Sequence, residues 1–278
     1  MSHYKLMHIQ DFNTKTNKQS IKNHFAILWV KFDDWFPYYQ EIRNEFGYST
    51  EKDQNAAYLL SRMIVRRSID IKKLEKKIRG RDVLAIGAGP SLEENIDFIR
   101  RSKKHVKVVA DGAVEALIKN KIKPDVVVSD LDGNPTFLKK AGKLGAIMVI
   151  HAHGDNEDAV TKLVPKLRNI IGSTQVMPVE KVYNFGGFTD GDRCVFMAEE
   201  MGAKSIVLVG MDFTDQTTKY SKGKTNNEKI KGRKLKQAKR LLEILSKRSK
   251  SMLFINSRTR IKGFAKLDSM KPREISRI

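Results

Sequence analysis

The stretch Pro124-Asp125-Val126-Val127-Val128-Ser129-Asp130-Leu131-Asp132-Gly133 carries a run of valines directly into a pair of acids. Consecutive valines are typical of a strand that is buried on both faces of a parallel sheet. Residues two apart on an extended strand face the same side, so the carboxylates of Asp130 and Asp132 point to one place. Such carboxylates suit Mg²⁺, which keeps several waters and is usually shared with substrate phosphates. Considered alone, this segment is also compatible with a polar turn that carries two solvated acids.

Apolar segments alternate with helical patterns on both sides of this stretch. We expect strands at Val83–Ile86, Val106–Ala110, Val126–Val128, Ala146–Ala152, Ser205–Gly210 and Met252–Asn256. We expect helices at Leu92–Arg101, Val114–Asn120, Pro135–Lys143, Asn156–Asn169, Asp190–Met201 and Glu228–Lys247. This alternation predicts an α/β fold with a mostly parallel, doubly wound sheet. Right-handed crossovers then bring the carboxyl ends of the strands to one edge, where open sheets bind ligands.

The 278 residues divide into three regions by composition and pattern. Residues 1–79 predict a small N-terminal helical subdomain, with helices at Ile21–Trp35 and Asn55–Arg79 and a stop at Gly80. Residues 80–256 predict the α/β domain that carries the site, and residues 257–278 a basic C-terminal tail.

The composition is that of a soluble globular protein, with 40% hydrophobic residues and a mean hydropathy of −0.44. No stretch approaches the roughly 20 apolar residues that a membrane span needs, so we expect no membrane association. The first ten residues lack the apolar core of a secretion signal. The single cysteine, Cys194, excludes an internal disulfide framework and is interpreted as a buried helix residue. Together these features predict a cytoplasmic protein.

The net charge of +21 invites a polyanionic partner, such as nucleic acid, an anionic membrane surface or a phosphorylated small molecule. The excess is local, because residues 217–250 hold 13 basic and two acidic residues. A helical apolar stripe runs through this segment, so many of its lysines lie on the wet face of an amphipathic helix. That stripe, made of Leu235, Ala238, Leu241, Leu242 and Leu245, disfavours nucleic acid as the partner.

The first strand ends in a glycine-rich turn, Gly87-Ala88-Gly89-Pro90-Ser91. Glycines allow a ligand to approach the backbone, and Ser91 with Glu94 has the spacing of a capping box at a helix start. Free amides at such a start favour a phosphate. The turn lacks the Walker and dinucleotide signatures, so it is weak evidence by itself.

Polar residues follow the next strands as well. Asp111 follows the second strand, and the fourth strand ends in His151, His153 and Asp155. The histidines share a face and could bind a transition metal with the aspartate. We favour the alternative that they hydrogen-bond a substrate or one another.

Two more loops belong to the same predicted edge. A glycine-rich loop with Gly186, Gly187 and Thr189 opens a helix, and Arg193 within that helix could reach a phosphate. Thr189 and Asp192 have capping-box spacing. Asp212 ends the strand that follows that helix.

In combination these motifs resemble the archaeal 6-hydroxymethyl-7,8-dihydropterin pyrophosphokinases, the MptE-like family. The residues that carry the resemblance are Gly87–Leu92, Ala110–Gly112, Pro124–Asp132, His151–Asp155, Gly186–Arg193 and Gly210–Asp212. The family core is similar to thiamine pyrophosphokinase, but Ser129 and Gly133 stand where that family has Gly and Ser. These departures favour the pterin relatives.

The resemblance implies transfer of pyrophosphate from ATP to 6-hydroxymethyl-7,8-dihydropterin, giving AMP, in folate- or methanopterin-type cofactor biosynthesis. Such a transfer requires a metal and an aligned hydroxyl. We expect Mg²⁺ at Asp111, Asp130 and Asp132, and phosphates at Gly87–Ser91 and Gly186–Arg193. A pterin ring needs acceptors, for which Asp155 or Asp212 is suitable. The general base stays open between His151, His153 and a metal-bound water.

Three questions remain at this stage. A glycosyltransferase-like nucleotide-sugar enzyme and a basic nucleic-acid-binding protein are the rival functions. Residues 214–229, with Lys219, Lys222 and Lys224, are either a lid over ATP or a solvated loop. The sequence is compatible with a homo-oligomer and does not decide the oligomeric state.

Overall fold

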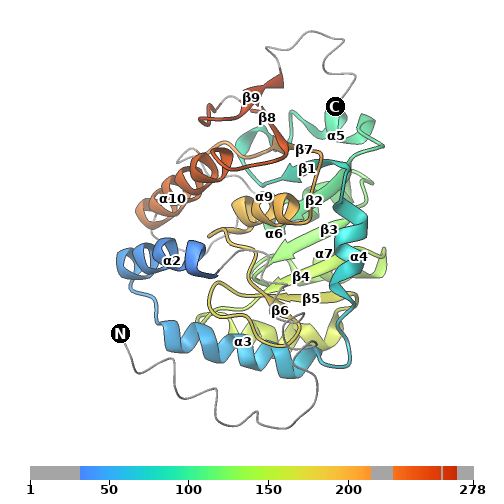
Figure 1. Ribbon diagram of the computed structural model, residues 1–278. Coiled ribbons are helices and arrows are strands. Elements are labelled where there is room, and N and C mark those ends of the chain that lie inside the picture. The colour runs from blue at the N-terminus through green and yellow to red at the C-terminus, as the bar shows by residue number, and fades with distance from the viewer. Residues whose placement is uncertain (1–31, 214–227, 258, 268–278) are drawn as a thin grey trace.

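The computed structural model describes residues 32–213, 228–257 and 259–267. Its centre is one all-parallel sheet of nine strands in the order β6-β5-β4-β3-β2-β1-β7-β8-β9 (Figure 1). The strands are β1 (Asp82–Ile86), β2 (Val106–Ala110), β3 (Val126–Ser129), β4 (Ile147–His151), β5 (Ile170–Ser173), β6 (Val182–Tyr183), β7 (Ser205–Val209), β8 (Met252–Asn256) and β9 (Ala265–Lys266). The predicted α/β class with a parallel sheet is confirmed.

Helices connect the strands. They are α5 (Ile96–Arg101), α6 (Asp111–Lys119), α7 (Pro135–Lys143), α8 (Glu157–Leu163), α9 (Asp190–Glu200) and α10 (Glu228–Ser246), with short 3₁₀ turns η1 (Pro90–Leu92) and η2 (Val164–Lys166). Helix α9 packs on β1, β2, β3 and β7 and crosses the middle of the sheet (Figure 1). Every residue of β2, β3 and β7 is buried, so both faces of the sheet are covered there.

Three helices precede the sheet: α2 (Phe32–Phe46), α3 (Thr50–Ile64) and α4 (Ile71–Ile78). Their buried faces, with Trp35, Leu60 and Leu74, belong to the same hydrophobic core as the sheet. The division of the chain into domains stays a prediction. Helix α2 lies beside α10 (Figure 1), and the two helices are joined by ion pairs of Glu41 with Arg240 and of Glu45 with Arg233.

The structure corrects several predicted boundaries. The helix expected over Asn55–Arg79 is two helices, because Asp70 caps a new start by accepting a hydrogen bond from the Lys72 amide. The helix expected at Ile21–Trp35 lies largely outside the described residues, and Trp35 belongs to α2. Strands β5, β6 and β9 were not predicted, and β9 lies inside the supposed tail. No described helix is long and apolar enough to cross a membrane.

Candidate active site

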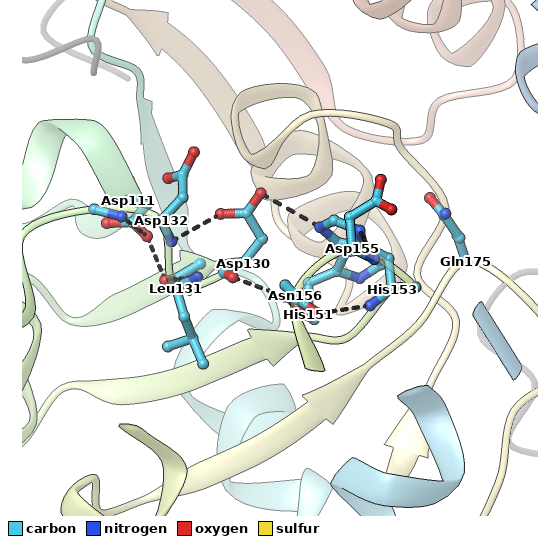
Figure 2. A network of polar contacts seen from close by, with 12 residues as sticks. Asp111, Asp130, Leu131, Asp132, His151, His153, Asp155, Asn156 and Gln175 are labelled. Carbon is cyan, nitrogen blue, oxygen red and sulfur yellow. Dashed lines mark hydrogen bonds and ion pairs between the residues drawn. The ribbon is translucent and has the colours of Figure 1, made fainter. Parts of the chain in front are cut away.

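Three aspartates from the ends of two neighbouring strands meet at the carboxyl edge of the sheet. Asp111 follows β2, while Asp130 and Asp132 follow β3. Each supplies a carboxylate oxygen, and these oxygens all lie within 4.8 Å of one another (Figure 2). The sequence predicted this meeting of side chains.

The loop after β3 holds Asp111 in place. Asp111 Oδ2 accepts hydrogen bonds from Ser129 Oγ at 2.5 Å and from the Gly133 amide at 3.1 Å. Leu131 turns the loop with a φ of +70°, a conformation that is uncommon for a residue with a side chain. Its amide donates to Ser129 Oγ at 2.9 Å, and its side chain is buried. Packing and hydrogen bonding therefore stabilise the turn that brings the acids together.

The donor set fits a hard divalent cation. Asp111 Oδ1 is buried and has no hydrogen-bond partner among the described residues, although buried polar atoms are normally paired. A Cβ at position 133 would lie 1.6 Å from that same oxygen, so only glycine leaves room for the carboxylate. An unpartnered carboxylate oxygen next to two further carboxylates is a suitable ligand set for Mg²⁺.

The charges of these acids oppose one another. Burial, together with the charge of Asp130, raises the pKa of Asp111 to about 6 despite the Ser129 hydrogen bond. Desolvation and the charges of Asp130 and Asp111 raise the pKa of Asp132 to about 8, although its side chain reaches solvent. Burial would also raise the pKa of Asp130, but the hydrogen bond and charge of His153, together with hydrogen bonds from Asp132, outweigh burial and lower that pKa. A bound divalent cation would relieve this repulsion.

The loop after β4 supplies the two histidines. His151 is buried, with Nδ1 3.3 Å from Ser173 Oγ, and burial and the Arg193 charge hold its pKa well below the usual value. His153 Nε2 lies 3.7 Å from Asp130 Oδ2. Asn156 joins the two loops, because its side-chain amide donates to the Asp130 and His151 carbonyls at 2.7 and 2.8 Å (Figure 2).

The transition-metal alternative for His151, His153 and Asp155 gains no support. Within the described residues, the ligand atoms of these three side chains do not converge as those of the aspartate cluster do. The two imidazole rings lie 5.9 Å apart between centroids, and His153 pairs with Asp130.

A cavity of about 240 Å³ opens beside the aspartates. Acids, histidines, two aromatic rings and one lysine line it, drawn from strand-end loops, from the α2–α3 connection and from α10. The lining residues are Tyr48, Asp130, Asp132, His151, His153, Asp155, Gln175, Phe188, Thr189, Asp190 and Lys234. A polar floor with an aromatic wall is typical of a small-molecule site.

A buried carboxylate behind the cavity fixes part of its wall. Asp53, at the start of α3, accepts hydrogen bonds from the Tyr39 hydroxyl, the Gln175 side-chain amide and the Gly154 backbone amide, each at 2.8 Å. The first partner lies on α2, the second after β5 and the third after β4. Because Gln175 donates its NH₂ group to Asp53, its side-chain carbonyl is the acceptor end, and the Gln175 side chain also interacts with His151.

The glycine-rich loop Gly186–Arg193 is built largely by its own contacts. The predicted capping box of Thr189 and Asp192 is confirmed. Arg193, however, is 1% exposed and donates to the Gly186 and Phe188 carbonyls, so it supports the loop from within and does not face the cavity. Gly187 passes so close that an added Cβ would lie 2.7 Å from Arg193 Cα. Thr189 is the predicted residue of this loop that lines the cavity.

The Gly87–Ser91 turn lies away from the cavity. Asp212 Oδ2 accepts hydrogen bonds from the Ser91 amide at 2.8 Å and from the Ser91 hydroxyl at 2.9 Å. Cβ atoms at Gly87 and Gly89 would each lie 2.7 Å from the Gly210 carbonyl oxygen, so these glycines serve packing against the end of β7. The prediction of Ser91 as a helix cap is wrong, because α5 begins only at Ile96. Asp212 is engaged here and does not line the cavity.

Sequence reasoning missed several cavity residues. Asp190 starts α9, and burial with the charges of the three aspartates raises its pKa well above the usual value. Its place directly after a glycine-rich loop was the available signal. Phe188 also lies within the predicted Gly186–Arg193 loop but was not singled out. No local pattern points to Tyr48, Gln175 and Lys234, which come together only through the fold. Residues 214–227, most of the proposed lid with its lysines, lie outside the described residues.

Fold and site together define an α/β protein with a cluster of three aspartates beside a cavity at the carboxyl edge of a parallel sheet. The chain belongs to the family described as 6-hydroxymethylpterin diphosphokinase MptE-like, whose model matches residues 54–218.

Three relatives carry the name 6-hydroxymethyl-7,8-dihydropterin pyrophosphokinase. The chain is 45% identical to the protein of Pyrococcus furiosus, over 81% of this chain and 98% of the relative. It is 40% identical to the protein of Methanocaldococcus jannaschii, over 76% of this chain and 94% of the relative. It is 38% identical to the protein of Methanothermobacter thermautotrophicus, over 77% of this chain and 94% of the relative.

A solved structure shares the fold. The MAf glycosyltransferase from Magnetospirillum magneticum AMB-1 superposes with a TM-score of 0.51 at 15% identity, over 69% of this chain and 34% of that one. At this identity the likeness concerns the fold alone.

Proposed function

We propose that this chain transfers the diphosphoryl group of ATP to 6-hydroxymethyl-7,8-dihydropterin in a Mg²⁺-dependent reaction that releases AMP. One observation carries the proposal: three carboxylates converge at an open, aromatic-walled cavity. The names of relatives that are 38 to 45% identical support the choice of substrate.

The chemistry requires alignment and charge neutralisation more than covalent help. The pterin hydroxyl oxygen forms a bond to the β-phosphorus of ATP. The bond between that phosphorus and the oxygen that bridges to the α-phosphorus breaks, and AMP leaves with the bridging oxygen. The hydroxyl proton must leave the attacking oxygen.

Asp111, Asp130 and Asp132 are the residues that would hold Mg²⁺. The unpartnered Oδ1 of Asp111 and the glycine that leaves room for it support this assignment. When bound, the ion would neutralise phosphate charge as it develops on the leaving group.

His153 is the residue that we assign to take the hydroxyl proton. It lines the cavity, and its Nε2 lies 3.7 Å from Asp130 Oδ2, so a positive charge on the ring would be stabilised there. His151 is less suitable because it is 3% exposed.

The pterin ring needs a flat apolar surface and polar partners. Phe188 and Tyr48 provide aromatic area in the cavity wall, and their ring centroids lie 6.3 Å apart. Asp155 and the side-chain carbonyl of Gln175 provide acceptors for the ring's amino group and N3 proton. Asp155 is therefore our candidate for binding the pterin ring, and we no longer assign that role to Asp212.

The decisive test follows nucleotide products from ATP, Mg²⁺ and the hydroxymethyl-dihydropterin. We expect AMP and a pterin pyrophosphate to appear in equal amounts. AMP release should stop when EDTA is added or when the pterin is omitted. Release of ADP alone would indicate a simple kinase and refute the proposal. Nucleoside diphosphate released from a nucleotide sugar with a sugar acceptor would support the rival glycosyltransferase function.

A further inference from the structure

Lys234 on α10 lines the same cavity as the aspartates, and among the described lining residues it is the one lysine or arginine. Four of the other lining residues are aspartates: Asp130, Asp132, Asp155 and Asp190. Those carboxylates that are ionised repel a polyphosphate unless positive charge is supplied. Divalent metal offsets part of the repulsion, and a magnesium-bound nucleoside triphosphate still carries net negative charge.

The position of Lys234 is fixed by aromatic rings. Its Nζ lies 5.8 Å from the Tyr48 ring centroid and 5.9 Å from the Phe188 ring centroid. Cations at such distances over ring faces are held electrostatically without being neutralised. Phe46 packs against both rings, with centroids 5.8 Å from Tyr48 and 5.1 Å from Phe188. The aromatic cluster thus holds the ammonium at the cavity wall.

Neighbouring basic residues on α10 have a different task. Arg233 pairs with Glu45, and Arg240 pairs with Glu41, so these two side chains join α10 to α2. Lys234 forms no salt bridge with a described carboxylate, and its charge is available to a ligand. It lines one cavity together with Asp130 and Asp132, so it lies on the same space that a metal-bound polyphosphate would occupy.

We propose that Lys234 binds the polyphosphate of the nucleotide donor and acts as the positive side of the site opposite the aspartates. This inference rests on the proposed function in that the donor is a magnesium–nucleoside triphosphate. It assigns a binding role to a residue outside the matched family segment, residues 54–218. Loss of one charge-assisted contact of this kind weakens binding by about tenfold or more.

The test measures binding without turnover. Isothermal titration with Mg²⁺ and α,β-methylene-ATP, in which the bond to be broken is replaced, reports affinity in the absence of pterin. We expect Lys234→Met to weaken binding about tenfold or more, and Lys234→Arg to stay within about threefold of the original protein. Lys236→Met is the matched control, because Lys236 is exposed on the same helix and does not line the cavity.

Steady-state kinetics separate this role from a structural one. We expect Lys234→Met to raise the KM for ATP, to leave the KM for the pterin unchanged, and to keep the melting temperature. The inference would be overturned if Lys234→Met binds the analogue with unchanged affinity. It would also be overturned if this variant raises only the KM for the pterin. If the original protein does not bind the analogue, both the role of Lys234 and the assignment of ATP as the donor are refuted. Analogue binding without pterin-dependent AMP release would count against the proposed reaction alone.

Discussion

Gly133→Ala is the most incisive perturbation of the site, because one added methyl group acts on one oxygen. A Cβ at position 133 would lie 1.6 Å from Asp111 Oδ1, and real Cβ atoms essentially never approach closer than 3.0 Å. The carboxylate must therefore retreat by about 1.4 Å. Retreat strains the hydrogen bonds that Asp111 Oδ2 accepts from Ser129 and Gly133. A misplacement of about 1 Å in a catalytic group can cost about a hundredfold in rate.

We therefore expect Gly133→Ala to lower kcat about a hundredfold and to raise the Mg²⁺ concentration that gives half-maximal AMP release. The control is Gly142→Ala in α7, where a Cβ would meet its nearest atom at 3.7 Å, an ordinary contact. Both variants should melt cooperatively near the temperature of the original protein. If Gly133→Ala keeps its rate and its Mg²⁺ requirement, Asp111 is not a metal ligand of the kind argued here.

Three further outcomes are expected. Asp130→Asn and Asp132→Asn should each lower AMP release at least about a hundredfold with little change in melting temperature, whereas Asp158→Asn, on an exposed side chain, should leave both unchanged. Metal-free protein should lose stability as pH rises, because carboxylates with pKa values raised to about 6 at Asp111 and about 8 at Asp132 stabilise the fold most when protonated. Mg²⁺ should therefore raise the melting temperature more at pH 8 than at pH 6, and an equal rise at both would contradict the assigned cluster. Asp53→Ala should cost about 3 kcal/mol in urea unfolding because two buried donors and one half-buried donor lose their acceptor, and should raise the pterin KM. Glu51→Ala, which changes an exposed side chain in the same helical turn, should do neither.

Periodicity predicted the central strands because each is a run of four or five mainly apolar residues between helices. The unpredicted strands are short: β6 and β9 have two residues each, and β5 includes Gly172. Such segments pair because neighbouring strands present open edges, and that condition belongs to the assembled sheet. The break between α3 and α4 had a local signal in Asp70, a residue type that favours helix starts, but the apolar spacing across it masked the signal.

The aspartate cluster could be predicted because its geometry follows from strand spacing and parallel topology. The direction in which a side chain points from its backbone position could not be predicted in the same way. Arg193 lies in the first turn of α9, directly after a glycine-rich loop, where an outward guanidinium would bind phosphate, yet its side chain points inward to two carbonyls. Tyr48 and Lys234 lie nearly two hundred positions apart and meet through the packing of α2 against α10.

The carboxyl edge of the sheet is divided into two parts with different tasks. In open parallel sheets ligands usually bind where the strand order reverses, which here is between β1 and β7. That place is filled by the chain itself, since the carboxylate of Asp212 takes the Ser91 amide and hydroxyl that a phosphate would otherwise use. Ser91 belongs to the 3₁₀ turn η1, so the Asp212 carboxylate satisfies an amide that would have no partner in the turn. The cavity instead opens beside the ends of β3, β4 and β5, where Asp111 Oδ1 has no partner among the described residues and the pKa values of Asp111 and Asp132 rise. Ligand binding is therefore favoured at the part of the edge whose charges the fold leaves uncompensated.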